Sequence, residues 1–356
     1  MNKKQNMYVT AKHFSITPYG NQFAIGAGSQ QIILTDKEEF RHILELAFFC
    51  LKPKSPADIN QFITKNHLKT DRFQFMLDHY FILTRQIDTS NKYSRNQIYF
   101  ESLGMNSNQL QNTISSKHIL IAGCGGIGTA LAYSLASLGV RKLTLIDADI
   151  IESSNLNRQF LFTESDLGKL KVTVLKEALL QRNSTISVDI ISENLSGLAL
   201  KAITDPIDCI LLSADDTACM PIINHFCVLQ RIPYLNIGYL NDISVIGPFY
   251  IPYKTACMCC DKHIFGTNHN NEQEKSQLDK VKLVNKRMIA PSSPCNNFMA
   301  ASMALTDLLF YFNNDFDHIN SFNKRVGLNN RDFSRIEIPI RPNKHCSLCQ
   351  TPRHIC

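Results

Sequence analysis

Short apolar runs alternate with segments of helical spacing along the chain from residue 117 onwards. The apolar runs predict strands, and the segments in which apolar residues recur every three or four positions predict helices. We expect strands at 118–122, 142–147, 188–192, 207–213 and 233–237, and helices at 128–138, 170–181, 221–230 and 296–312. Strands and helices that alternate in this way form a parallel sheet, so the predicted fold class is α/β with a mostly parallel sheet. The Asn-, Gln-, Glu- and Lys-rich segment 261–287 predicts a mobile excursion from this fold.

The first 92 residues predict a separate small α+β module. The expected elements are a hairpin over 22–34, helices that start at Thr35 (as the capping residue), at Ser55-Pro56 and at residue 69, and a strand over 80–83. Strands combined with three short helices favour a winged-helix arrangement. Residues 84–116 are polar and have little apolar periodicity, which predicts a linker or an extended arm. We therefore expect two domains, 1–92 and 93–356.

Composition and charge exclude several classes of protein. Hydrophobic residues make up 44% and charged residues 19% of the 356 residues, which is a globular composition and argues against a disordered or fibrous chain. The net charge of +6 is small and spread along the chain, so it does not indicate nucleic acid; a basic pocket for an anionic ligand would account for it equally well. The sequence has no apolar run long enough for a membrane helix and no signal peptide, so we expect a cytoplasmic protein without a membrane partner.

A glycine-rich loop lies directly between a predicted strand and a predicted helix. It consists of Gly123, Gly125, Gly126, Ile127 and Gly128, with a cysteine at the second position. Glycines let the backbone approach a phosphate, and the helix N-terminus supplies N–H groups and a positive dipole end. This loop by itself indicates only a nucleotide, with NAD as the usual candidate, and a glycine-rich turn without a ligand is the alternative.

Charged and polar side chains downstream of the loop change that interpretation. They are Asp147 and Asp149 after the next strand, Asn155, Arg158 and Gln159 in one turn, and Lys171 at a helix start. Asp147 is placed to accept hydrogen bonds from ribose hydroxyls. Fixed cations suit a triphosphate, because attack at the α-phosphate develops charge on its oxygens. Singly, Arg158 could form a surface ion pair and Lys171 could be a solvated helix residue.

Two metal sites are predicted. Cys257-x-x-Cys260 and Cys346-x-x-Cys349 each chelate through one turn, and together they make a closed tetrahedral zinc site, whereas Cys259 is not expected to bind. Asp215, which follows a strand, is placed to hold Mg²⁺ on phosphate oxygens. The neighbouring Asp216 competes for that role, and a helix cap is the other interpretation of Asp215. For the cysteines, the alternative is four unligated surface thiols.

Together these motifs resemble the ubiquitin-activating (ThiF/MoeB-like) superfamily, which includes the adenylating enzymes of thiamin and molybdopterin synthesis. The likeness spans roughly residues 92–350. It implies a Rossmann-like adenylation domain, ATP and Mg²⁺, with Arg158, Lys171 and Asp215 as catalytic residues. Segment 92–96 is similar to an Arg-Tyr-x-Arg-Gln arm that reaches the ATP of a second subunit. The first Arg is Lys92 and the Gln is Asn96 here, but Arg95 is present, which implies a homodimer completed in trans.

Within the superfamily, the stretch 233–252, the pair at 296–297 and the residues 323–325 resemble microcin C-type maturation adenylyltransferases. These enzymes also begin with a winged-helix clamp that holds a short ribosomally made precursor peptide, partly by β-addition. The resemblance implies adenylation of a carboxyl- or carboxamide-bearing residue through an acyl-AMP, as a step in peptide antibiotic biosynthesis. A phosphoramidate product and a cyclised product, as in pantocin biosynthesis, both remain open.

Two other functions are considered. An activator of a sulfur-carrier or ubiquitin-like protein needs a transfer thiol, for which Cys295 is the candidate, but the extra N-terminal module argues against it. A non-catalytic peptide-binding protein on a degenerate fold is disfavoured by the presence of Arg158, Lys171 and Asp215.

Overall fold

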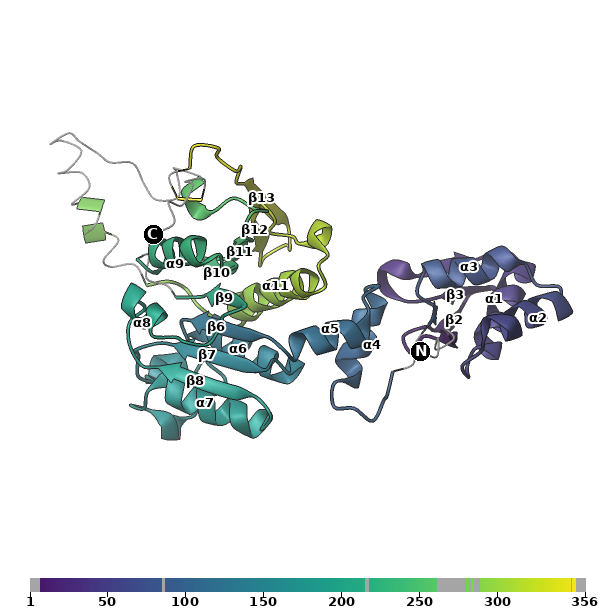
Figure 1. Cartoon of the computed structure of the whole chain (residues 1–356), viewed down its shortest axis with the longest axis horizontal. Helices are drawn as coiled ribbons and strands as arrows, with labels where there is room; N and C mark the ends of the chain where they lie inside the picture. Colours follow the sequence, from purple (N-terminus) through teal and green to yellow (C-terminus); the bar gives the residue numbers. More distant parts are fainter. Residues whose placement is uncertain are drawn as a thin grey trace. The chain divides into compact units, whose positions relative to one another are not determined.

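The computed structural model describes residues 7–84, 87–214, 218–260, 280–281, 283–284, 289–346 and 348–349. The chain forms two compact units, Met1–Asn112 and Thr113–Cys356, each described by itself below (Figure 1). The two compact units divide after Asn112, whereas the resemblance found in the sequence begins near residue 92. The predicted domain boundary at residue 92 stays a prediction. In the described part of the chain, no helix is both long enough and apolar enough to cross a membrane.

In the smaller unit, two small sheets and the first helices of the chain surround one apolar core. The first sheet pairs β1 (Val9–Thr10) with β5 (Ile82–Leu83), and the second joins β2 (Ile16–Tyr19), β3 (Gln22–Ile25) and β4 (Ile32–Leu34) in antiparallel order. The helices are α1 (Lys37–Phe49), α2 (Pro56–Lys65) and α3 (Thr70–Asp78). The predicted hairpin and helices are present. The cap of α1 is Asp36 rather than Thr35, because the Asp36 carboxylate accepts from the N–H groups of Glu38 and Glu39.

The segment predicted as a linker or an extended arm forms two helices, α4 (Ser94–Ser102) and α5 (Ser107–Ile114). Apolar periodicity missed α4 because two of its inward-facing residues are polar: Gln97 and Glu101 are buried beside Phe100. Glu101 accepts a hydrogen bond of 2.8 Å from the Ser107 hydroxyl, which joins the two helices. A helix that buries polar residues has little apolar periodicity, so its sequence resembles that of a loop.

The larger unit is built on an eight-stranded sheet in the order β13-β12-β11-β10-β9-β6-β7-β8. Strands β6 (His118–Ala122), β7 (Lys142–Ile146), β8 (Ser187–Ile191), β9 (Cys209–Leu212) and β10 (Tyr234–Leu240) are parallel, as predicted. Three antiparallel strands extend the sheet: β11 (Ile243–Tyr250), β12 (Lys324–Asn329) and β13 (Arg335–Pro339). The sheet is thus mainly parallel, and the α/β fold class is confirmed.

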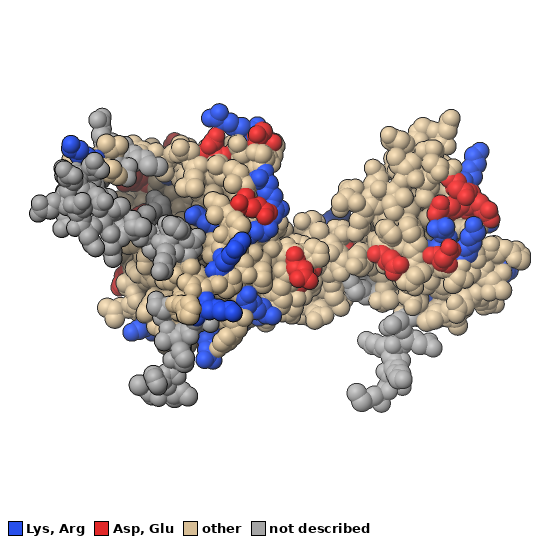
Figure 2. Space-filling view, turned by 90° about the horizontal axis from the view of Figure 1, so that it is seen from above, with Lys and Arg blue, Asp and Glu red and all other residues tan. Residues whose placement is uncertain are grey.

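Helices cover both faces of this sheet (Figure 1). Helices α6 (Gly126–Leu138), α7 (Lys171–Arg182) and α11 (Pro294–Phe312) lie on one side, and α8 (Gly197–Lys201) and α9 (Cys219–Gln230) on the other. The apolar core between α9 and the strands includes Leu120, Ile210 and Tyr234. The predicted excursion at 261–287 falls largely outside the described residues. On the face seen in Figure 2, Lys and Arg side chains gather on the larger unit and mix with Asp and Glu on the smaller one.

Candidate nucleotide site and cysteine cluster

The glycine loop turns tightly between β6 and α6. Gly123 adopts a φ of +94°, a conformation that favours glycine, and its N–H donates to Ile146 O at 2.9 Å. The Ser213 hydroxyl donates to Gly123 O at 2.8 Å. At Gly128 an added Cβ would lie 1.9 Å from Gly123 O, so the loop folds back on itself with no room for a side chain there. The first N–H groups of α6 have no partners inside the helix, and an N-terminus of this kind suits an anion such as a phosphate.

Asp147 follows β7 and is joined to this loop. Its Oδ2 accepts from Cys124 N at 2.6 Å and its Oδ1 accepts from Asp149 N at 2.8 Å. Burial raises the pKa of the Asp147 carboxyl, and the two backbone hydrogen bonds oppose that shift. Each carboxylate oxygen keeps a second lone pair, so Asp147 remains able to accept from a ribose hydroxyl.

Lys171, the first residue of α7, is paired with another predicted site residue. Its Nζ lies 2.6 Å from Asp149 Oδ2, and its N–H donates to Asp149 O at 3.0 Å. The Lys171 side chain is buried, whereas the Asp149 side chain is 68% exposed. The sequence predicted both residues in the site, but only the structure shows that they pair. The Asp149 carboxylate holds the buried Lys171 ammonium group and is itself exposed to solvent.

The turn that carries Asn155, Arg158 and Gln159 places each differently. Asn155 is buried and its Oδ1 accepts from Glu152 N at 3.0 Å, which shapes the turn. Arg158 is exposed and its Nη1 donates to Ser154 O at 2.7 Å, and among the described residues no carboxylate pairs with it. Gln159 is buried with its Oε1 unpartnered, and its Nε2 lies 4.0 Å from the position of a Cβ on Gly125. Gln159 is therefore next to the glycine loop.

Asn297, near the start of α11, also contacts the loop and was not predicted as a site residue. An added Cβ on Gly126 would lie 2.6 Å from Asn297 Nδ2. The same Nδ2 donates to Ser293 O at 2.8 Å and to the Ser292 hydroxyl at 3.0 Å, so the side chain is held in place. The only signal in the sequence was its position in an Asn-Asn pair ahead of an apolar helix.

Two predicted residues remain untested by this geometry. Asp215 lies outside the described residues, as does Asp216. The two residues before them do contact the loop, since an added Cβ on Gly123 would lie 2.6 Å from Ala214 N. Arg95 lies on α4 in the smaller unit, and its role toward ATP stays a prediction.

Four cysteines meet in one cluster, as predicted. The sulfur atoms of Cys257, Cys260, Cys346 and Cys349 all lie within 4.8 Å of one another. Neighbouring sulfurs are 4.0 Å (257 to 260), 3.7 Å (257 to 346) and 3.5 Å (260 to 349) apart. A tetrahedral zinc ion with Zn–S bonds of about 2.3 Å requires sulfurs about 3.8 Å apart, so the donor set fits zinc. Cys259 points to a different partner, because its sulfur accepts from Asn224 Nδ2 at 3.1 Å.

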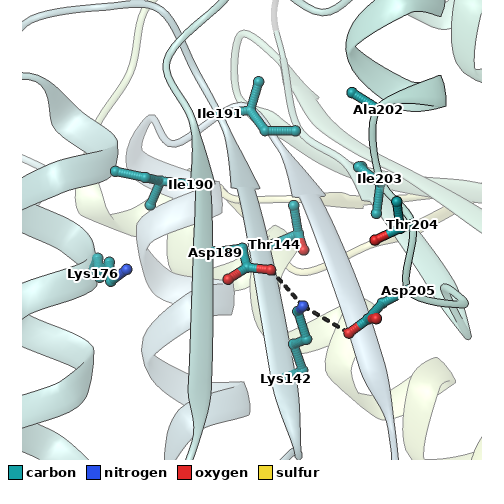
Figure 3. A pocket seen from close by; sticks show the side chains of 10 residues that line it. All are labelled: Lys142, Thr144, Lys176, Asp189, Ile190, Ile191, Ala202, Ile203, Thr204 and Asp205. Carbon is teal, nitrogen blue, oxygen red and sulfur yellow. Dashed lines mark hydrogen bonds and ion pairs between the residues drawn. The ribbon is translucent and has the colours of Figure 1, made fainter.

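A cavity of about 370 Å³ lies elsewhere on the sheet (Figure 3). Lys142, the first residue of β7, stands between Asp189 at 2.5 Å and Asp205 at 2.9 Å. Hydrogen bonds to these two carboxylates raise the pKa of Lys142, so the ammonium group stays charged and its charge is balanced by theirs. The cavity is lined by none of the predicted site residues, so the glycine loop remains the candidate nucleotide site.

Comparison with known proteins identifies the family. The model of the ThiF family matches residues 93–348, which include the glycine loop, the Arg158 turn and the four cysteines. The chain belongs to the ThiF family.

Individual ThiF-type relatives fall into two groups by coverage. E. coli MccB with ATP is 31% identical, with a TM-score of 0.84 over 96% of this chain and 99% of that chain. The microcin C7 biosynthetic enzyme MccB in complex with N-formylated MccA is 31% identical, with a TM-score of 0.87 over the same shares. The sulfur carrier protein ThiS adenylyltransferase of E. coli K12 is 33% identical over 172 residues, which is 48% of this chain and 66% of that protein. The chain spans less than two thirds of the length of the first curated relatives it matches.

Proposed function

We propose that this ThiF-family adenylyltransferase uses ATP to activate a carboxyl- or carboxamide-bearing residue of a short, ribosomally made precursor peptide, as a step in peptide antibiotic biosynthesis. One observation carries the proposal: the likeness to MccB, which is solved with ATP and with the peptide MccA, covers both units of the chain. The likeness to sulfur-carrier adenylyltransferases covers about half of the chain. The smaller unit then supplies peptide recognition, which a sulfur-carrier activator has no need of.

The loop and its neighbours suit transfer of an AMP group. The glycine loop and the N-terminus of α6 offer N–H donors to phosphate oxygens, and Asp147 offers an acceptor to the ribose. Arg158 and Lys171 offer fixed positive charge where the α-phosphate becomes more negative in the transition state. A carboxylate is already ionised at neutral pH and is itself the nucleophile, so no general base is needed; pyrophosphate leaves and an acyl-AMP forms.

Two metal ions complete the proposal. Asp215 would hold Mg²⁺, which neutralises charge on the phosphates when bound. The four-cysteine cluster would hold a structural zinc ion that ties the C-terminal residues around Cys346 to the turn at Cys257. We further propose a homodimer in which Arg95 of one chain completes the site of the other.

ATP–pyrophosphate exchange with candidate peptides tests the adenylation. We expect exchange to depend on a peptide and to be lost in Arg158→Ala, because removing a transition-state contact costs on the order of 3 kcal/mol or about 100-fold. Arg335→Ala, which removes an exposed cation paired with Glu337, is the matched control and should exchange normally. Normal exchange by folded Arg158→Ala would remove its catalytic role, and exchange driven only by a protein ending in Gly-Gly would favour the sulfur-carrier alternative.

The dimer has its own test. Arg95→Ala and Arg158→Ala chains mixed together should regain part of the activity, because one of the two sites in a mixed dimer holds both arginines. A monomer by light scattering that is fully active at the same concentration would contradict the arrangement in trans.

A further inference from the structure

Arg325 on β12 is a partly buried cation without a counter-charge. Among the described residues its side chain forms no ion pair and no hydrogen bond, and its Nε is fully buried and unpartnered. Burial lowers the pKa of the Arg325 guanidinium with no acidic group to oppose the shift. The nearest acid on the next strand, Glu337, is used by Lys324 at 2.8 Å and by Arg335 at 2.5 Å.

An uncompensated charge of this kind destabilises a fold. Burying an ion without a partner costs free energy that hydrophobic side chains of similar size do not cost. Stability alone would therefore favour an apolar residue on β12 at this position. A ligand that supplies the missing anion explains why a cation stands at this position in spite of that cost.

The strand pairing places Arg325 on one face of the antiparallel extension. Cross-strand partners share a face, and Arg325 is paired with Ile338 while Gly327 is paired with Ile336 and Val245. The other face is the one that α11 covers, since the Ser244 hydroxyl there donates to Asn296 O. The strand register thus places Arg325 on the side of β11–β13 opposite α11.

This face combines exposed apolar side chains with bare backbone. Ile338 is 54% and Leu240 is 61% exposed, and Ile336 is also exposed. At Gly238 the surface is low, because a Cβ added there would meet no atom within 4 Å, whereas Gly327 is buried beneath the Ile243 side chain. An extended apolar segment fits over Gly238 and against the exposed Leu240, Ile336 and Ile338, with its charged group beside the guanidinium.

We propose that this face, defined by Leu240, Gly238, Ile336, Ile338 and Arg325, binds a segment of the peptide substrate in which apolar side chains lead to a carboxylate. The inference rests on the proposed function, because it takes the substrate to be a peptide. A carboxylate suits a single arginine, whose planar fork pairs with two oxygens at once. It is a second substrate contact, separate from the carboxyl group that is adenylated beside the glycine loop.

Arg325→Met tests the charge, because Met keeps an unbranched apolar chain and removes the guanidinium. We expect the melting temperature to rise by about 2 °C or more without ligand. We also expect hexanoate, used as a carboxylate probe with an apolar tail, to shift the Arg325 Nε–H resonance of the wild-type protein, whereas the neutral isostere hexanamide does not. Arg335→Met, which removes an exposed and paired cation from the next strand, should leave hexanoate binding unchanged.

The outcomes separate this inference from the proposed function. With a peptide that supports exchange, Arg325→Met should raise the peptide KM about tenfold and leave the ATP KM unchanged. An unchanged peptide KM, a lower melting temperature than that of Arg335→Met, or equal shifts by hexanoate and hexanamide would each overturn the inference while adenylation stands. Exchange with no peptide at all would instead refute the proposed function. If Arg325→Met does not fold, Arg325→Gln carries the same comparison.

Discussion

Replacing Gly128 by alanine tests whether the glycine loop is held by close packing of its own backbone. The added Cβ would lie 1.9 Å from Gly123 O and 3.0 Å from the Ser213 hydroxyl, whereas ordinary contacts begin at 3.4 Å. The Gly123 carbonyl would have to move by about 1.5 Å, and as backbone it cannot rotate away. Overpacking of this severity costs about 3 kcal/mol, which for a unit of this size lowers the melting temperature by about 6–12 °C.

Gly125→Ala is the matched control on the same loop. Its Cβ would meet only Gln159 Nε2 at 4.0 Å, and Gly125 has a φ of −73° that alanine adopts readily. We therefore expect an unchanged melting temperature for Gly125→Ala, so that any loss of ATP affinity in it reports contact with the nucleotide itself. Gly128→Ala should lose both stability and, through a loop shift of more than 1 Å, about 100-fold in exchange.

Thermal unfolding and binding of a fluorescent ATP analogue measure both effects. Wild-type stability and ATP affinity in Gly128→Ala would refute the packing argument. Destabilisation of Gly125→Ala would show that the space beside that residue is not open.

Three further predictions concern other parts of the larger unit. Elemental analysis should find about one zinc per chain, and Cys346→Ser should lower that content and the melting temperature more than the activity per folded molecule; metal-free wild-type protein would contradict the site. Burial lowers the pKa of His118, so the unfolded state takes up a proton below about pH 6.5 that the folded state resists, and the melting temperature should fall between pH 7 and pH 5, less so in His118→Gln. Cys295, exposed in the first turn of α11, should be dispensable, and Cys295→Ala should keep adenylation and peptide conversion. A thioester trapped on Cys295 would instead indicate a sulfur-transfer enzyme.

Local patterns were sufficient for much of the fold. The parallel strands and their helices were predicted because each buried strand is a run of apolar residues. The start of α2 was predicted from Ser55-Pro56, and in the structure Ser55 and Asp58 cap it through hydrogen bonds within four residues. The cap of α1 was placed one residue early because Thr35 and Asp36 are both capping residues, and only the backbone geometry selects one. Helix α4 was missed because it buries polar residues and so lacks apolar periodicity. Strand β13 was also not predicted, although its residues Arg335 to Ile338 alternate between polar and apolar; every residue of this strand is exposed.

The sequence by itself determined which residues have the chemistry for the site: the glycines, Asp147, Arg158, Lys171 and the paired cysteines. Their types and spacing carry that information, because each motif forms within one turn or at one strand end. The tertiary structure alone decided their partners. The pairing of Lys171 with Asp149 and the contact of Asn297 with Gly126 join residues that lie 22 and 171 positions apart. Contacts at such separations depend on how helices pack on the sheet, which no local pattern encodes.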